Sequence, residues 1–562
     1  MTYRVGEAVP GTDHQDLDKT GEAVAPTTEA LTADAVHPAR PLTGSACPAT
    51  LGDGRRPRRY SSPRTGKPHC MDHSTAPVLD ALRAYQDQDQ LPFTPPGHKQ
   101  GRGADPRVRA VLGDALFGAD MLAVSGLDDR TDSKKVLERA ERLMADAVGA
   151  EHTFFSTCGS SLSVKAAMLS VAGPHEKLLV SRDAHKSVVS GLILAGIRPV
   201  WVDPQWDPRL HLAHPPAPDA FRAAFEEHPD ARGALLTSPT PYGTCADIGA
   251  VAALCHARGV PLVVDEAWGA HLPFHPELPT WAMDAGADVC VTSVHKMGSG
   301  LEQGSVFHLQ GDLITPQTLA SRADLLDTTS PSVLIYAALD GWRRQMVEYG
   351  HELMEESLER ARRVRAAVQG IDGLHVNDRD DFCSAGRAFD MDPLQIFIDL
   401  SSLKFTGYDA ADWLRRHHRI NLHTSDHRRI NAQLTHADDE TTVARLLDGL
   451  RDLVAHADDL PPAPDIRVPD PGDLRLRQVT LPRDAFFGEV EQVPAHEAVG
   501  RVCAETLTPY PPGIPAALPG EVLDRAVVDY LRTGVDAGML VPDAADSSVA
   551  TIRVSVHDVG AD

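Results

Sequence analysis

Two short, largely apolar runs constrain the fold of this 562-residue chain more than any other feature. One run covers residues 261–264 and ends at Asp265, and the other covers residues 289–294 and leads to Lys296. Neither run alternates with polar residues, which is typical of strands that helices cover on both faces of a parallel sheet. The two runs therefore predict neighbouring strands of an α/β fold.

Each run leads to a charged side chain that suits one kind of ligand. Because ligands of open α/β sheets bind beyond the carboxyl ends of the strands, we expect Asp265 and Lys296 to face the same small molecule. A lysine amine can form a Schiff base with the aldehyde of pyridoxal phosphate, and a carboxylate can keep its pyridine nitrogen protonated. Either residue alone is more often a helix cap or a solvated group, so the prediction depends on the pair.

The chain around these runs alternates between predicted strands and helices. Strands are expected at 153–156, 177–181, 199–202, 234–238 and 305–309, and helices at 159–171, 220–227 and 248–258. This alternation is typical of a right-handed, mostly parallel sheet. A long amphipathic helix is expected at 333–369, interrupted near Gly350, and a strand and two helices after it suggest a small α+β domain.

Several motifs together resemble one enzyme family. The sequences DEAW (265–268) and SVHK (293–296) are similar to those of fold-type-I pyridoxal-phosphate enzymes, specifically the ornithine/lysine/arginine decarboxylases in their shorter form without an N-terminal receiver-like domain. The string PYPPGIP (509–515) is similar to the C-terminal signature of the same decarboxylases. The resemblance implies a mostly parallel seven-stranded sheet with helices on both faces, a smaller α+β domain and a C-terminal domain.

The resemblance also implies roles for individual residues. Lys296, Asp265 and His185 are expected to be catalytic, with His185 stacked on one face of the cofactor ring and the small Ala267 against the other face. A Gly followed by Ser160 and Ser161 at a helix N-terminus suits a phosphate, although an ordinary N-cap would look the same. The predicted cofactor-binding set is Ser160, Ser161, His185, Asp265, Ala267, Ser293, His295 and Lys296. Glu521 and Trp268 are the predicted substrate contacts, with Glu521 receiving the distal cation.

Three further segments bear on the predicted site by resemblance. PGHK (96–99) is expected near the active site, although its residues alone favour a rigid turn. RTDS (130–133) replaces the Pro/Gly-containing loop that is usual in the family. DTTSPS (327–332) is similar to a loop that reaches the neighbouring subunit's cofactor, which implies a homodimer with shared active sites, and a higher oligomer stays open.

The expected reaction is loss of CO2 from ornithine, lysine or arginine to give an amine of polyamine biosynthesis. These three substrates differ in distal length and head group, so the sequence leaves the choice open. Another fold-type-I activity, an aminotransferase or a lyase, would use the same cofactor residues. A non-catalytic regulatory homologue is a further alternative, against which the presence of Lys296, Asp265 and His185 counts.

Composition excludes some other classes of protein. A net charge of −25 argues against nucleic-acid binding, which requires clustered Lys and Arg. No stretch approaches the roughly 20 apolar residues of a membrane span. The eight cysteines form no CxxC pair, so we expect reduced thiols, no metal site and a cytoplasmic location.

The predicted domain organisation has four parts. Residues 1–70 lack apolar periodicity and are expected to be a disordered extension, with Met71 a candidate start. Residues 71–330 are expected to form the large α/β domain that binds pyridoxal phosphate, together with an N-terminal segment. A small α+β domain at 331–460 and a C-terminal decarboxylase domain at 461–562 follow, the latter opening with a Pro-rich linker.

Overall fold

The computed structural model describes residues 71–123, 135–463, 475–510 and 513–556. The chain divides into a unit of residues 1–68 and a unit of residues 69–562, and every element named below belongs to the second. The predictions for the extension at 1–70 and for the loop at 130–133 lie outside the described residues.

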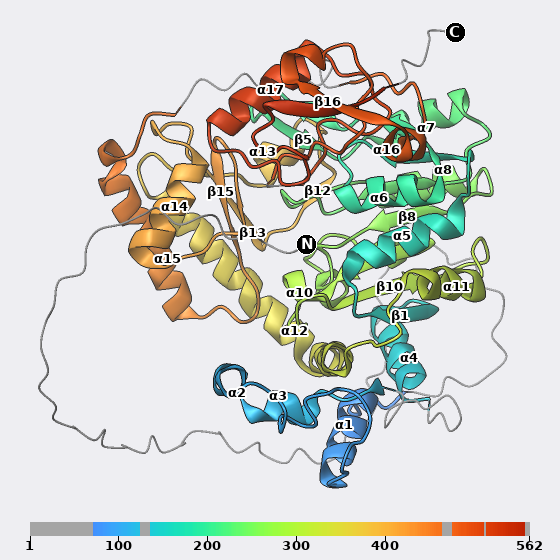
Figure 1. Ribbon diagram of the computed structural model, residues 1–562. Helices are drawn as coiled ribbons and strands as arrows, with labels where there is room; N and C mark the ends of the chain where they lie inside the picture. Colours follow the sequence, from blue (N-terminus) through green and yellow to red (C-terminus); the bar gives the residue numbers. More distant parts are fainter. Residues whose placement is uncertain (1–70, 124–134, 464–474, 511–512, 557–562) are drawn as a thin grey trace, which may run out of the picture. The chain divides into compact units, whose positions relative to one another are not determined.

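The large domain is built on one seven-stranded sheet in the order β1-β10-β9-β8-β6-β2-β3 (Figure 1). Five consecutive strands, from β9 to β3, are parallel, and β10 runs antiparallel between β9 and β1. The predicted mostly parallel seven-stranded sheet is therefore confirmed. The strands are β1 (His152–Ser156), β2 (Lys177–Ser181), β3 (Arg198–Val202), β6 (Ala234–Thr237), β8 (Leu262–Asp265), β9 (Val289–Ser293) and β10 (Ser305–Leu309).

Separate apolar clusters cover the two faces of this sheet. Val263 of β8 and Val289 and Val291 of β9 belong to the cluster on one face, whereas Val264 and Cys290 belong to the cluster on the other. Because successive strand side chains point to opposite faces, a strand covered on both faces needs an apolar residue at every position. One face is covered by α5 (Gly159–Val171), α6 (Lys186–Ala195) and α11 (Pro316–Leu326), and the other by α4 (Val136–Val148), α7 (Pro218–Glu227), α8 (Ile248–His256) and α12 (Val333–Gln369).

The N-terminal segment of the large domain packs on α12 through a buried ion pair. It contains α1 (Pro77–Asp87), α2 (Pro106–Leu112) and α3 (Asp114–Ala119). Arg343 of α12 pairs with Asp340 at 2.8 Å and donates to the carbonyl oxygens of His73 and Thr75. Asp340 in turn accepts from the backbone amide of Val78 at 2.8 Å. Each buried charge is therefore both paired and hydrogen-bonded, as burial requires.

The helix α12 is continuous over 37 residues, so the predicted interruption near Gly350 is wrong. A Cβ at Gly350 would lie 3.1 Å from Cε of Met346 and 3.4 Å from Cβ of Phe274. Phe274 belongs to the 3-10 turn η2 (Leu272–Phe274) that crosses the helix here. The glycine thus serves close packing against this turn rather than a break in the helix.

After α12 the chain forms a four-stranded antiparallel sheet in the order β11-β13-β15-β14. Its helices α14 and α15 pack against each other and begin at hydrogen-bonded capping boxes. The elements of this region are β11 (His375–Val376), α13 (Arg379–Cys383), β12 (Asp390–Met391), β13 (Gln395–Asp399), α14 (Gly407–His418), β14 (Thr424–Ser425), β15 (Arg429–Gln433), α15 (Glu440–Ala455) and η3 (Ala457–Asp459).

The C-terminal residues have an apolar core of their own, formed around α17 and the antiparallel pair β16 and β17. Their elements are α16 (Pro482–Phe487), β16 (Val490–Pro494), η4 (Ala495–Glu497), α17 (Arg525–Asp536) and β17 (Thr551–Ser555). The remaining short elements lie in loops of the large domain: β4 (Gln205–Asp207), β5 (Leu212–His214), β7 (Thr244–Cys245), α9 (Ala282–Ala285) and α10 (Val294–Met297).

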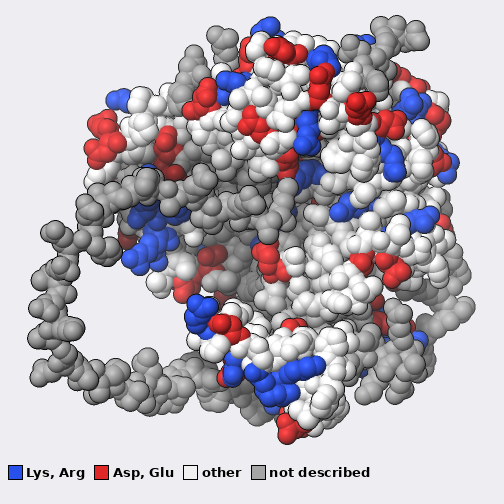
Figure 2. Space-filling view, viewed as in Figure 1, with Lys and Arg blue, Asp and Glu red and all other residues white. Residues whose placement is uncertain are grey.

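The surface carries charges of both signs, interspersed over the face that Figure 2 shows. None of the helices in the described part of the chain is both long and apolar enough to cross a membrane.

Candidate active site

Asp265 and Lys296 lie at the carboxyl ends of neighbouring strands. Asp265 is the last residue of β8, in register with Val291 of β9, and Lys296 lies in the short helix α10 that directly follows β9. Since β8 and β9 are parallel, both side chains are brought to the same edge of the sheet. The predicted pairing of strands therefore holds.

The charges of Asp265 and Lys296 act on each other. Burial raises the pKa of Asp265, and the positive charge of Lys296 opposes that shift. Burial lowers the pKa of Lys296, and the carboxylates of Asp265 and Glu302 oppose it. The Asp265 Oδ1 also accepts from the amide of Ala267 at 3.3 Å, which helps to hold the carboxylate ionised. The neutral amine is the nucleophilic form, and a lowered pKa raises the share of Lys296 that is neutral.

The amine of Lys296 lies against Trp268, and His423 packs on Trp268. The Nζ atom lies 4.2 Å from the centre of the Trp268 ring, a cation–π distance. His423 packs edge-on against the same indole, with ring centroids 4.6 Å apart. Burial, followed by the charge of Lys296, lowers the pKa of His423 to about 4. His423 was not predicted from the sequence, because it stands just before the short strand β14 with no motif around it.

His185 is the N-cap residue of α6, and its ring is anchored from the side of Nδ1. Nδ1 accepts from the backbone amide of Ser187 at 3.2 Å and lies 2.9 Å from its hydroxyl. Burial and then the charges of Lys296 and Lys186 lower the pKa of His185 to about 4, so the imidazole is neutral at physiological pH. A Cβ at Gly513 would lie 3.5 Å from Cδ2 of His185. Gly513, from the C-terminal signature, thus lies beside the predicted site.

The structure brings two of the four predicted polar phosphate contacts together. Ser160, in the first turn of α5, accepts a hydrogen bond from the hydroxyl of Ser293 at 2.8 Å. Ser161 is exposed beside them. His295 instead has Nδ1 3.0 Å from the carbonyl oxygen of Gly304. Hydroxyl groups and free amides at a helix N-terminus suit a phosphate, so this corner fits the predicted cradle.

Glu521, one of the predicted substrate contacts, is fully buried and has partners of its own. Its carboxylate lies 3.3 Å from the guanidinium of Arg182 and accepts from the amide of Leu518 at 2.9 Å. Arg182 also donates to the carbonyl oxygens of Pro515 and Ala516. These contacts favour a structural role for Glu521 in joining the C-terminal residues to β2. Its role toward the substrate stays a prediction.

The two loops expected near the cofactor differ in position. Asp327, which opens DTTSPS, accepts a hydrogen bond from the thiol of Cys158 at 3.3 Å, directly before the first residue of α5. In PGHK, the ring of His98 bonds to the carboxylate of Asp120, and the amine of Lys99 donates to the carbonyl oxygen of Thr94. All four residues belong to the N-terminal segment. Neither loop touches the predicted site residues through any described hydrogen bond.

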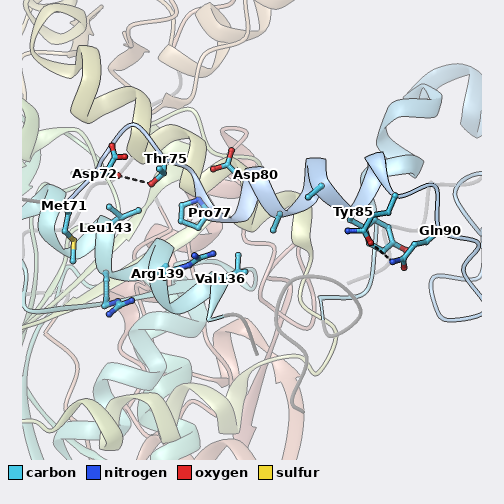
Figure 3. A pocket seen from close by; sticks show the side chains of 14 residues that line it. Met71, Asp72, Thr75, Pro77, Asp80, Tyr85, Gln90, Val136, Arg139 and Leu143 are labelled. Carbon is cyan, nitrogen blue, oxygen red and sulfur yellow. Dashed lines mark hydrogen bonds between the residues drawn. The ribbon is translucent and has the colours of Figure 1, made fainter. Parts of the chain in front are cut away.

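A separate cavity of about 750 Å³ lies between α1 and α4 (Figure 3). It is lined by Asp72, Asp80 and Tyr85 from one side and by Arg139 and Leu143 from the other. None of the predicted site residues lines it. Within the described ranges, no cluster of His, Cys, Asp and Glu has the arrangement of a metal site.

The sheet order and the lysine–carboxylate pair at its carboxyl edge define a class of protein, the fold-type-I enzymes that use pyridoxal phosphate. More narrowly, the chain belongs to the Orn/Lys/Arg decarboxylase family. The family's major domain matches residues 76–383, and its C-terminal domain matches residues 476–543. The protein is therefore a pyridoxal-phosphate-dependent decarboxylase of a basic amino acid.

Individual relatives agree with this assignment. An arginine decarboxylase of Halalkalibacterium halodurans is 36% identical over 481 residues, covering 85% of this chain and 97% of that protein. An arginine decarboxylase of Bacillus subtilis is 34% identical over 487 residues, covering 86% of this chain and 98% of that protein. The crystal structure of a lysine decarboxylase of Francisella novicida shares the fold, with a TM-score of 0.70 at 19% identity over 85% of this chain and 79% of that one.

Proposed function

We propose that the substrate is arginine and that Lys296 is the amine that binds the cofactor's aldehyde. The observation that carries the second part is the position of Lys296 and Asp265 at the ends of the adjacent parallel strands β9 and β8. The choice of arginine is supported by relatives of 34–36% identity that are named arginine decarboxylases and match this chain over 97–98% of their lengths.

In this proposal each site residue has one task toward the cofactor. Pyridoxal phosphate, when bound, supplies a pyridine ring that accepts electron density from the α-carbon as CO2 leaves. Asp265 would keep the ring nitrogen protonated, neutral His185 and Ala267 would pack on its two faces, and Ser160 and Ser293 would bind the phosphate. Ser161 and His295 are the remaining proposed phosphate contacts. Lys296, with its lowered pKa, would hold the proton that returns to the α-carbon.

The substrate assay separates arginine from the alternatives. Purified holoenzyme is incubated with arginine, lysine and ornithine, and products are identified by mass spectrometry together with released CO2. We expect agmatine, with kcat/KM at least about tenfold higher for arginine than for the other two. An α-keto acid product would indicate an aminotransferase instead. A preference for lysine or ornithine would overturn the choice of arginine.

Replacing the proposed cofactor-binding amine tests the site itself. We expect Lys296→Ala to lower kcat by about 10³-fold or more, because the nucleophile is lost. The near-visible absorbance of the bound cofactor should also shift to that of a free aldehyde. Lys404→Ala is the matched control, since that side chain is 80% exposed and should leave both readouts unchanged. Retained activity in Lys296→Ala would favour a different cofactor lysine.

We also propose that the enzyme is a homodimer with shared active sites. Large apolar side chains are exposed along the N-terminal segment, with Phe93 90% and Val111 82% exposed. Such a row is typical of a surface that another protein covers. Thr328, Thr329 and Ser330 of the DTTSPS loop are also exposed, which would allow them to reach a second subunit.

A reducing, cytoplasmic location is supported by the six described cysteines, all of which are free thiols.

A further inference from the structure

A second cavity, of about 820 Å³, lies beside the edge strand β3. Its walls come from the ends of β2 and β3, from α7, and from the C-terminal residues 475–476 and 514–516. A volume of this size suits a small organic ligand. None of the residues proposed to bind pyridoxal phosphate lines this cavity.

The cavity contains a buried carboxylate without a charged partner. Asp183 is 3% exposed and lines the cavity just after β2. One of its oxygens accepts from the hydroxyl of Ser181, and the other, Oδ2, has no hydrogen-bond partner among the described residues. Burial raises the pKa of this carboxyl to about 7, opposed only by its own backbone amide. An unpaired buried carboxylate is costly, and a cation would relieve that cost.

Three of the cations that line the cavity have partners of their own. Lys177 pairs with Asp230 at 2.9 Å, and Arg475 pairs with Asp203 at 3.4 Å. Arg182 donates to two backbone carbonyl oxygens and pairs with Glu521. Arg198 stands exposed on the first residue of β3. The carboxyl oxygen of the lining that still lacks a partner among the described residues is Oδ2 of Asp183.

Two indole rings give the cavity flat apolar walls. The guanidinium carbon of Arg182 lies 5.2 Å from the centre of the Trp201 ring. Trp206 of β4 lines the same cavity. The Nε1 of Trp206 is buried without a hydrogen-bond partner among the described residues. Tryptophan faces attract cations and pack against flat groups. The lining thus combines aromatic surface with one buried carboxyl oxygen that has no partner among the described residues.

We propose that this cavity binds a small, flat organic cation of the amidinium or guanidinium type, with Asp183 as its acceptor and the two tryptophans as its walls. The site adjoins the active site through one short segment. Ile514, Pro515 and Ala516 line the cavity, and the preceding Gly513 packs on His185. The proposal does not depend on which amino acid the enzyme decarboxylates.

Three probes of one shape and different charge test the proposal by isothermal titration calorimetry on the holoenzyme. Benzamidine is cationic, benzamide is neutral and benzoate is anionic. We expect benzamidine to bind at least tenfold more tightly than the other two. Equal binding of benzamide, a preference for benzoate or the absence of binding by benzamidine would overturn the proposal.

Three variants locate the bound probe. Asp183→Asn should lower benzamidine affinity at least tenfold, because it removes the charge and keeps the shape. Ala224→Trp fills the cavity from α7 and should block the probe with the carboxylate intact. Glu227→Gln is the matched control, since this carboxylate lies on the same rim but is 79% exposed and should change affinity less than twofold. Unchanged affinity in both Asp183→Asn and folded Ala224→Trp would overturn the proposal.

Discussion

At the scale of single residues, Lys296 is held in a balance of opposing effects. Burial favours its neutral form, whereas the carboxylate of Asp265 and the face of Trp268 favour the cation. The pKa is lowered, so burial is the stronger effect. A lowered pKa makes the neutral amine more populated than in a free lysine, and the neutral amine is the form that attacks an aldehyde.

His423 provides the first residue-scale prediction, because its ring holds Trp268 against Lys296. We expect His423→Ala to lower kcat/KM by about 10- to 100-fold, since misplacing a group that positions the reacting amine has effects of this order. His423→Phe should retain most activity because it preserves the ring contact. Steady-state kinetics of both variants, with cofactor content checked by absorbance, provide the measurement.

The chain offers a close control for this variant. His417 packs on Trp413 at the same centroid distance, 4.6 Å, but within α14. His417→Ala should leave kcat/KM unchanged. Wild-type kinetics in His423→Ala would show that the contact has no part in the reaction.

The residues of the site were predictable from the sequence to different degrees. Lys296 and Asp265 follow short, largely apolar runs, so the strands that position them could be inferred from the same residues. His423 reaches the site from the second sheet, and only tertiary packing brings it to Trp268. Glu521 was assigned by resemblance alone, and its pairing with Arg182 could not be inferred because the two residues lie 339 positions apart.

Asp183 carries a prediction for the pH dependence of stability. Its pKa is raised from 3.8 to about 7 in the folded protein. Its contribution to stability is therefore fully present below the unfolded-state value and is lost as the pH rises through about 7. The free energy of unfolding of Asp183→Asn minus that of the parent should therefore be about 2–3 kcal/mol larger at pH 8 than at pH 5.

Urea denaturation at the two pH values measures this difference. The exposed Glu227→Gln serves as its control, because its difference from the parent should be the same at both pH values. A constant difference for Asp183→Asn as well would mean that this carboxyl titrates in the folded state as it does in the unfolded chain.

At the scale of elements, the strands that were easiest to predict are those buried on both faces. The expected bounds of β2 and β10 agree with the structure, because a short group of apolar residues that polar residues precede leaves little freedom in placing the strand. The strands β4, β5, β7 and β12 were not predicted, because two or three residues carry no periodicity. β4 and β5 pair with each other, whereas β7 and β12 are distant in the chain, so that their pairing depends on tertiary packing.

Two glycines of α12 provide the element-scale prediction. A Cβ at Gly341 would meet nothing within 4 Å, whereas one at Gly350 would meet Met346 and Phe274. Gly341→Ala should therefore stabilise the protein by about 0.5–1 kcal/mol, the usual gain in a helix interior. Gly350→Ala should gain less, because the neighbours must move to admit the methyl group. Thermal denaturation of the two variants side by side checks the order, and a larger gain at Gly350 would contradict it.

At the scale of the whole molecule, two segments expected near the cofactor make no described hydrogen bond to the proposed site residues within one chain. The described side-chain hydrogen bonds of the PGHK segment stay within the N-terminal segment, and Thr328, Thr329 and Ser330 of the DTTSPS loop are exposed. In a symmetric dimer the same surfaces of both subunits meet, so each subunit can complete the other's site. A dimer with shared active sites is therefore expected to behave differently, when two variants are mixed, from an enzyme whose active site is formed within one chain.

Mixing two inactive variants tests whether the active sites are shared. One variant is Lys296→Ala, and the other replaces Thr328, Thr329 and Ser330 with alanine. If the loop acts in the neighbouring subunit's site, a mixed dimer has one site with both changes and one site with neither. Random exchange makes about half of the dimers mixed, so activity should return to about a quarter of the wild-type value. If the loop acts in its own chain, every site carries one change, and mixed dimers verified by two affinity tags will remain inactive.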